Sequence, residues 1–168
     1  MNRLLWRWGW LALCGVALAA CAAAGGGRPD WPMVQIACGG QSGSAGVAPG
    51  FAVYADESSF AAAFAAIHAG ELPSPPVPGV DFDRWLVAAG FLGQHPTAGY
   101  GIDLASARVE GDRLVVTVVR RAPPAGAITA QVITTPYCLV RLARGGGRTV
   151  RFVDEAGQRL AELPLQAP

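Results

Sequence analysis

GFLGQHPTAGYGIDL, residues 90–104, joins an apolar segment to an alternating one through a glycine-rich turn. Before the turn, Trp85–Leu92 is an almost continuous apolar run, which is typical of a strand covered on both faces. After it, the residues from Tyr100 to Leu104 alternate between large and small or polar side chains, the pattern of a half-buried strand. Pro96 restricts the backbone between them, and two glycines permit a tight path. We therefore predict two strands joined by a compact, exposed recognition loop.

Working outward, the same criteria predict strands along most of the chain after residue 33. The Gly111-Asp112 pair predicts a hairpin turn. The predicted strands are 33–38, 51–55, 85–92, 100–109, 114–120, 128–134, 137–142, 149–153 and a last one ending at residue 160. Together they indicate an α+β fold, mostly antiparallel and sandwich-like, with one amphipathic helix.

The helix is predicted after Asp56, whose carboxylate suits the N-cap position. Apolar residues recur at helical spacing from Phe60 to Ile67 and form a docking face. Gly70 is expected to end the helix as the C′ residue. His68 lies off the apolar face, so we expect it to be exposed.

The first 20 residues have the features of a signal peptide, a cationic start and an apolar run too short to span a bilayer. The sequence Leu18-Ala-Ala-Cys21 resembles the bacterial lipobox. That resemblance implies diacylglycerol on the Cys21 thiol, and Ala22 implies the outer membrane, with the protein facing the periplasm. The alternative is an ordinary secretory leader. Residues 21–32 are expected to be a flexible tether and residues 33–168 a single domain.

Composition sets further limits on function. Hydrophobic residues make up 52% of the chain, enough for a substantial core. All 13 basic residues are arginines, two of them in the leader, and they face 12 acidic residues. Nucleic acid is therefore not an expected partner, because its binding needs a basic surface.

Two cysteines remain once Cys14 leaves with the leader and Cys21 is lipidated. In an exported protein Cys38 and Cys138 are expected to form a disulfide, and two buried free thiols are the alternative.

Other candidate chemistry is weak. Asp81 and Asp83 suit a turn better than a metal or acid–base site, because no third ligand lies nearby in the sequence. The glycine-rich stretch 39–50 lacks the lysine of a phosphate-binding loop. A hydrolase would need Ser42 or Ser44 paired with His68 or His95, in no recognised arrangement. No enzyme activity, metal or cofactor is predicted.

Several motifs resemble one family. They are Val-Asp-Phe-Asp at 80–83, Gly-Gln-His-Pro-Thr-Ala-Gly-Tyr at 93–100 and Thr-Thr-Pro-Tyr-Cys-Leu-Val at 134–140. In this order, the motifs are similar to the C-terminal domain of PrcB-type protease-complex subunits. The resemblance covers roughly residues 51–153, with His95 where the family usually has arginine and Ala98 where it has glycine. It implies an exported lipoprotein that supports a secreted protease as a non-enzymatic accessory subunit.

The residues expected to bind a protein partner lie in the glycine-rich loop between residues 92 and 100, called the central loop, and in the motif at 134–140. They are His95, Pro96, Thr97, Gly99, Tyr100, Pro136 and Tyr137. An alternative function comes from residues 96–100, which are similar to the Pro-Thr-Thr-Gly-Tyr loop of chagasin-type cysteine-protease inhibitors. Those small β-domains insert three loops into an active-site cleft. Residues 145–147 would supply their glycine-rich second loop, and the domain lacks their third, Arg-Pro-Trp element.

Overall fold

The computed structural model describes residues 30–41 and 48–165. The predicted signal peptide, Cys21 and most of the predicted tether therefore lie outside the described residues. Within the described ranges, no helix has the length and apolar character needed to cross a membrane.

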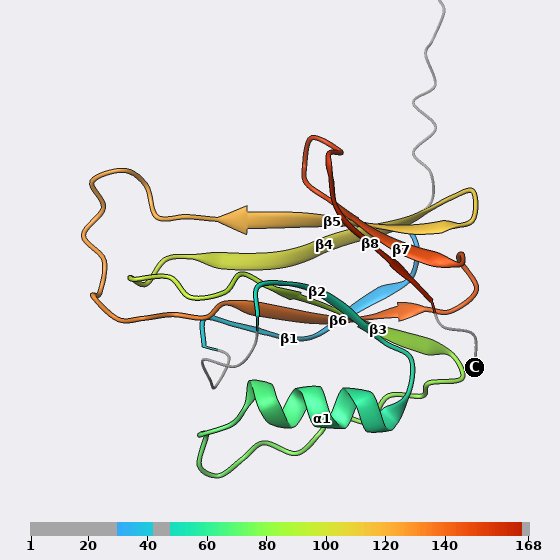
Figure 1. Cartoon of the computed structure of the whole chain (residues 1–168), viewed down its shortest axis with the longest axis horizontal. Helices are drawn as coiled ribbons and strands as arrows, with labels where there is room; N and C mark the ends of the chain where they lie inside the picture. The colour runs from blue at the N-terminus through green and yellow to red at the C-terminus, as the bar shows by residue number, and fades with distance from the viewer. Residues whose placement is uncertain (1–29, 42–47, 166–168) are drawn as a thin grey trace, which may run out of the picture.

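Two four-stranded sheets face each other, and one helix covers the outer face of the first sheet (Figure 1). The first sheet has the order β1 (Met33–Gly39), β6 (Tyr137–Ala143), β3 (Trp85–Phe91), β2 (Gly50–Tyr54). The second has the order β4 (Gly101–Glu110), β5 (Arg113–Arg121), β7 (Thr149–Val153), β8 (Arg159–Pro164). Neighbouring strands are antiparallel except β5 and β7, which run parallel. The mostly antiparallel sandwich with one helix is confirmed.

The strand β3 is buried on both faces, as its continuous apolar sequence predicts. Leu86 and Ala88 pack between the two sheets, while Val87 and Ala89 pack under the helix. Gly90 lies between the sheets, where a Cβ atom would be only 3.0 Å from Ile102 Cδ1. The absence of a side chain at this position lets the sheets approach closely where the central loop begins.

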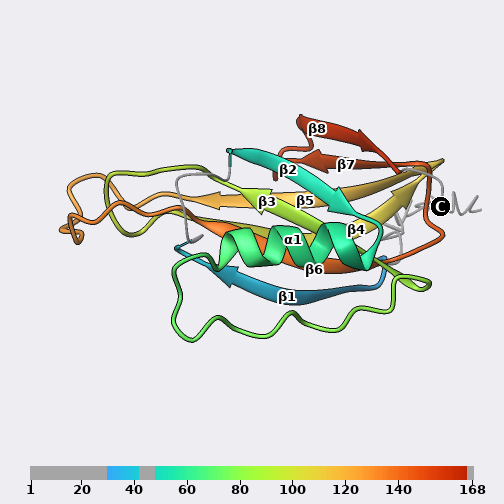
Figure 2. The ribbon, with the colours of Figure 1, turned by 60° about the horizontal axis from the view of Figure 1, so that its bottom comes forward.

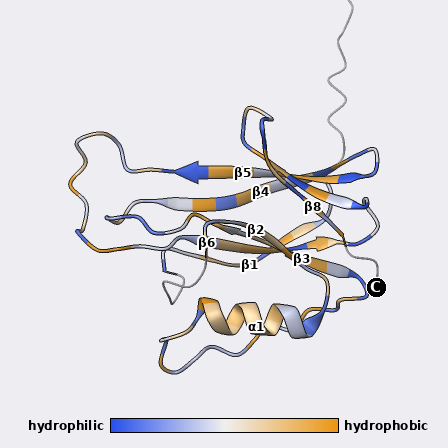
Figure 3. Ribbon diagram, in the orientation of Figure 1, coloured by the Kyte–Doolittle hydropathy of each residue, from blue (hydrophilic) through white to orange (hydrophobic). Residues whose placement is uncertain are grey.

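The helix α1 (Glu57–Ile67) lies across the first sheet and presents its apolar side to β3 and β6 (Figures 2 and 3). Its N-terminus is capped as predicted, because Asp56 Oδ1 accepts a hydrogen bond of 2.8 Å from the Ser59 N–H. This backbone hydrogen bond is the main reason why the pKa of the Asp56 carboxyl is lowered.

Two expectations at the other end of the helix are wrong. The C-cap is His68, and Gly70 lies two residues beyond it with φ of +98°. His68 is buried, because its ring packs on Phe64 with centroids 4.2 Å apart and meets Tyr137 edge-on. Its Nδ1 is 2.8 Å from Glu71 Oε1, while its Nε2 is buried and has no hydrogen-bond partner among the described residues.

The strand predicted over residues 128–134 is also wrong. The chain there crosses from β5 in the second sheet to β6 in the first, so it leaves one sheet before it joins the other. Only Thr134 and Thr135 form isolated bridges, with His95 and Gln41.

Two residues before the predicted domain start at residue 33 also bond to the domain. The Trp31 N–H donates to Ala107 O at 2.7 Å, and Trp31 Nε1 donates to Ala143 O at 2.7 Å. Pro32 O accepts from the Ala143 N–H. Trp31 thus joins the two sheets at the end where the chain enters the domain.

Candidate interaction surface

Two long loops lie together at the end of the sandwich opposite Trp31, on the left of Figure 1. They are residues 92–100, between β3 and β4, and residues 122–136, between β5 and β6, and together we call them the loop end. His95 and Thr134 exchange backbone hydrogen bonds of 2.8 and 2.9 Å, and Ala98 N–H donates to Ala130 O at 3.0 Å. Thr134 Oγ1 also donates to Thr97 O. These bonds hold the two loops as one ordered surface.

The aromatic rings of His95 and Tyr100 stack within this surface, with centroids 4.0 Å apart and planes 17° from parallel. Both residues are half-buried, as is Thr97, while Pro96 and Gly99 are exposed. Gly99 has φ of +97°, and a Cβ atom there would lie 3.1 Å from Pro123. The five predicted residues in this loop are therefore gathered at one place.

The other two predicted contact residues are not accessible. Pro136 is buried, and its carbonyl accepts the Leu92 N–H at 2.9 Å. Tyr137 is 6% exposed and packs under the helix against His68. Burial, and secondarily the charge of Glu71, raises the pKa of its phenol. The expectation that Pro136 and Tyr137 meet a partner is therefore corrected: Tyr137 belongs to the core, and Pro136 anchors the start of β6.

The loop end also carries apolar residues that the sequence analysis assigned to a strand. Ile128 is fully exposed, Ile133 is 62% exposed and Val132 is 46% exposed. Figure 3 shows hydrophobic positions on this loop, beyond the strands. Residues 122–136 contain no charged side chain. That uncharged run, bounded by Pro123-Pro124 and Pro136, is the sequence signal that could have identified them.

A disulfide joins two strands next to the loop end. Cys38 in β1 and Cys138 in β6 are direct cross-strand partners, and they form the predicted bond. Next to it lies an open cleft of about 200 Å³, and its lining includes the Asp103–Arg121 ion pair. The cleft is lined by Cys38, Gly39, Gly40, Tyr100, Gly101, Ile102, Asp103 and Arg121. Asp103 approaches both sulfurs, but disulfide sulfurs are not thiolate ligands, so this group does not form a metal site.

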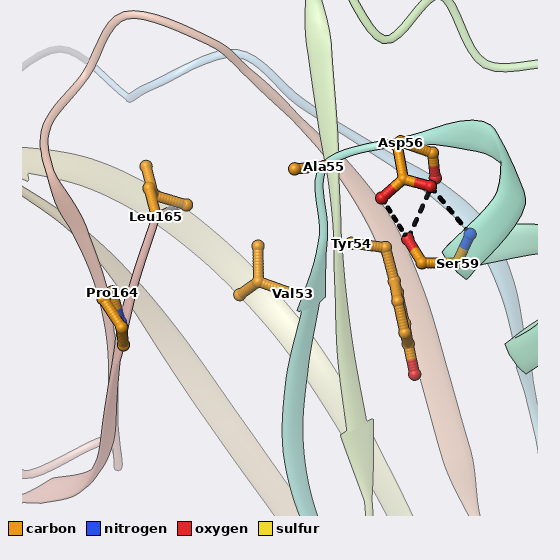
Figure 4. A pocket seen from close by; sticks show the side chains of 7 residues that line it. All are labelled: Val53, Tyr54, Ala55, Asp56, Ser59, Pro164 and Leu165. Carbon is orange, nitrogen blue, oxygen red and sulfur yellow. Dashed lines mark hydrogen bonds between the residues drawn. The ribbon is translucent and has the colours of Figure 1, made fainter. Parts of the chain in front are cut away.

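A second pocket, of about 170 Å³, lies between β2 and the end of β8 (Figure 4). Its polar side chains are Tyr54, Asp56 and Ser59, and the last two are engaged in capping the helix. The pocket therefore offers no free catalytic group from this pair.

The acidic pair before β3 has the structural role that was predicted. Asp81 Oδ1 accepts the Asp83 N–H, and Asp81 O accepts the N–H groups of Arg84 and Trp85. Asp81 thus closes the turn that leads into β3.

The glycines at 145–147 lie far from the loop end, in the turn between β6 and β7. Gly146 packs against Leu114 and Trp31 near the opposite end of the sandwich. Residues 96–100 and 145–147 therefore do not form one edge, as two loops of a chagasin-type inhibitor would need to do.

Comparison with known protein families gives a match within the domain. The family model described as PrcB C-terminal matches residues 86–143, from β3 through β6. Neither the curated proteins nor the solved structures contain a match to the chain. The matched segment includes the central loop, the β4–β5 hairpin, the apolar loop and the disulfide-bonded strand β6. Residues 86–143 of the chain are therefore similar to the PrcB C-terminal family.

Proposed function

We propose that this protein is a non-enzymatic, lipid-anchored binding module of the cell envelope, whose loop end holds a protein partner. In this proposal it is an accessory or stabilising subunit of a secreted protease or of another envelope complex. The observation that carries the proposal is the exposure of Ile128, Val132 and Ile133 on a loop held in place by hydrogen bonds to its neighbour.

Exposed aliphatic residues on an ordered surface favour a binding role. Clusters of large apolar side chains in water are unfavourable for a soluble domain, and they commonly mark interaction sites. The loop end is fastened by the His95–Thr134 and Ala98–Ala130 hydrogen bonds, so little conformational entropy is lost when a partner binds. The family match supports the accessory role, because the matched segment contains the whole loop end.

The geometry of the two histidines also favours binding over hydrolysis. A histidine base needs a nucleophile within hydrogen-bond reach and a group that orients its ring. His95 Nε2 is buried and has no hydrogen-bond partner among the described residues. His68 is bonded to Glu71 and packs against Phe64 and Tyr137 at the end of the helix. Ser42 and Ser44 lie outside the described residues.

The position of Trp31 fits a membrane anchor before the domain. The chain enters at one end of the sandwich, and the exposed apolar loop lies at the other. A lipid on Cys21 would thus attach the domain at the end opposite the loop end, which would leave the loop end accessible to a periplasmic partner. Mass spectrometry of the mature protein should find a diacylglyceryl group on Cys21, and an unmodified N-terminus at another residue would contradict the anchor.

The partner itself is tested by purification from native membranes. The full-length protein with a C-terminal tag is extracted in mild detergent and compared with Pro96→Asp and Ile128→Asp variants. Leu72→Asp serves as the matched control, because Leu72 is 95% exposed on a different loop. We expect a protease or other envelope protein to co-purify with wild type and control and to be lost from both loop variants. Equal recovery in all four samples, or no recovered protein, would refute the proposal.

A further inference from the structure

We infer that residues 73–78, in the connection between α1 and β3, are a preformed ligand for a partner protein whose binding groove is lined by aromatic side chains and rimmed by basic ones. The sequence of these residues is Pro-Ser-Pro-Pro-Val-Pro, and we call them the proline segment. The segment belongs to neither loop of the loop end, so the inference goes beyond the proposed function.

The backbone of the proline segment has little conformational freedom. Every residue in it is either a proline or the residue before one. A proline fixes its own φ at about −65°, and the residue before it is pushed toward extended backbone. Together these restrictions favour a polyproline II helix, which has no internal hydrogen bonds. The structure agrees, because residues 73–78 belong to no helix or strand and form no hydrogen bond with another described residue.

The chain on either side of the proline segment is fixed to the domain. Before it, the Glu71 N–H donates to His68 O at 3.1 Å. After it, the ring of Phe82 packs near that of Phe60 with centroids 6.0 Å apart, and Phe82 O accepts from Arg144 Nε at 2.6 Å. The connection runs extended from the end of the helix back to the start of β3 (Figure 2). Because the segment is ordered before binding, little conformational entropy is lost when a partner binds.

The exposed side chains of the segment have the spacing that aromatic grooves bind. A polyproline II helix has about three residues per turn, so residues three apart share an edge. Pro75 and Pro78 form one such pair and are half-buried, which turns their edge toward the domain. Pro73 and Pro76 form another pair and are exposed, and Val77 is 44% exposed. The exposed pair has the Pro-x-x-Pro spacing that the grooves of SH3 and WW domains recognise.

The charges around the proline segment specify the rim of the groove. Residues 56–83 contain no lysine or arginine, and their acidic residues are Asp56, Glu57, Glu71, Asp81 and Asp83. Within the described ranges, none of these carboxylates forms an ion pair with an arginine. Basic residues at the rim of the partner's groove would therefore be complementary to the flanks of the segment.

Two other occupants fit less well. An anionic lipid surface would be repelled by the acidic residues on both sides of the segment. A second copy of this chain would have to offer an aromatic groove, and no aromatic residue in ranges 30–41 and 48–165 is exposed. A different protein with an aromatic groove meets neither difficulty.

A phage-displayed library of SH3 domains tests the inference with a defined probe. The library keeps the aromatic groove and randomises the residues at its rim. The full-length protein in detergent is used for selection, and enriched domains are measured by fluorescence anisotropy after labelling. We expect the enriched domains to carry arginine or lysine at the rim. Replacing the groove tryptophan of an enriched domain by alanine should weaken binding at least tenfold.

Matched variants of the full-length protein locate the binding. Pro76→Ala removes one exposed ring, and we expect it to weaken binding at least tenfold. Pro124→Ala is the matched control, because it changes an exposed proline at the loop end, and it should leave binding unchanged. The double variant Asp81→Asn, Asp83→Asn keeps an acceptor in the turn before β3 and removes two charges. It should weaken binding at least threefold and make binding less dependent on salt. Thermal melting checks that the variants are folded.

Several results would overturn the inference. They are the absence of any enriched domain, equal binding to wild type and Pro76→Ala, and enrichment of acidic rims. Loss of binding in Ile128→Asp with binding kept in Pro76→Ala would place the site at the loop end instead. The co-purification experiment on the loop end has a separate readout, so its failure would leave binding at residues 73–78 standing.

Discussion

Glu162 on β8 forms ion pairs with several arginine side chains on the outer face of the second sheet. Arg151 donates two hydrogen bonds to Glu162 Oε2 at 3.0 and 3.1 Å, and Arg113 Nε lies 3.2 Å from Oε1. Thr149 Oγ1 adds a contact to the same carboxylate. The hydrogen bond from Arg151 is the main cause of a pKa of Glu162 below its usual 4.5.

A carboxyl group whose pKa is lower in the folded state stabilises the protein above its unfolded pKa. This contribution is lost as the pH falls through the folded pKa, because protonation breaks the charge-assisted bonds. We therefore expect Glu162→Gln to be less stable than wild type at about pH 7, and the difference to shrink toward about pH 3. Urea unfolding at several pH values measures it. A difference that is constant with pH would indicate packing rather than charge as the origin.

His68 illustrates a residue whose environment is not local in sequence. Its ring is enclosed by Phe64 from the helix and Tyr137 from β6, which is 69 positions later in the chain. Helical periodicity places His68 off the apolar face, but the end of the helix turns it toward β6. The sequence therefore could not predict its burial, because the covering residue comes from a distant strand.

Removing the His68 ring should open a cavity beneath the end of the helix. We expect His68→Ala to lower the free energy of unfolding by about 2 kcal/mol, from lost packing and the lost bond to Glu71. Denaturant titration gives the value. Glu71→Gln is the matched control, since it keeps the packing and changes only the acceptor. If the two variants lose equal stability, the packing contribution is refuted.

At the scale of elements, local patterns predicted most of the strands that have neighbours, although the last strand, predicted to end at residue 160, runs over Arg159–Pro164. The alternation after Tyr100 and the apolar run of β3 each match a strand of the structure within one residue at either end. Residues 128–134 have an equally strong β pattern and form none. The β propensity of a segment does not by itself decide whether it pairs with another strand. Because β5 and β6 belong to different sheets, the segment that connects them has no neighbouring strand to pair with.

The disulfide links two elements whose pairing is also distant in the sequence. It joins edge strand β1 to β6 across a sequence separation of 100. A Cys38→Ala, Cys138→Ala double variant should lose about 2–5 kcal/mol of unfolding free energy, because the unfolded chain gains freedom. Urea unfolding with and without a thiol reductant measures this loss. The reductant should lower the stability of wild type and leave the double variant unchanged; an effect on both would assign the loss elsewhere.

At the scale of the whole molecule, Trp31 joins the two sheets at the end where the chain enters. Its backbone bonds to β4 and its indole to the end of β6. Trp31→Ala should therefore cost about 2–4 kcal/mol of unfolding free energy, since the side chain packs against the main core and its hydrogen bond is lost. Thermal and urea unfolding measure it. Trp31→Phe should lose less than half as much, because most of the packing remains, and an equal loss would contradict this account.

The candidate site was predicted only in part, and the reason appears at this scale. The central loop carries its own signal in proline and glycine, so residues 95–100 could be placed on an ordered turn. The apolar residues at 128–133 and the burial of Tyr137 depend on how the two sheets stack and where the helix lies. Local sequence patterns do not predict packing of this kind.

The disulfide has a mechanical consequence. Strand β1 starts at the Trp31 end and β6 starts at the loop end, so opposite pulls at these ends would slide the two strands past each other in shear. The Cys38–Cys138 bond joins these same two strands. Tension would pass from β1 through the sulfur bridge into Pro136 and the apolar loop, bypassing the other residues between the two cysteines. The oxidised domain can thus transmit load between its two ends without unravelling.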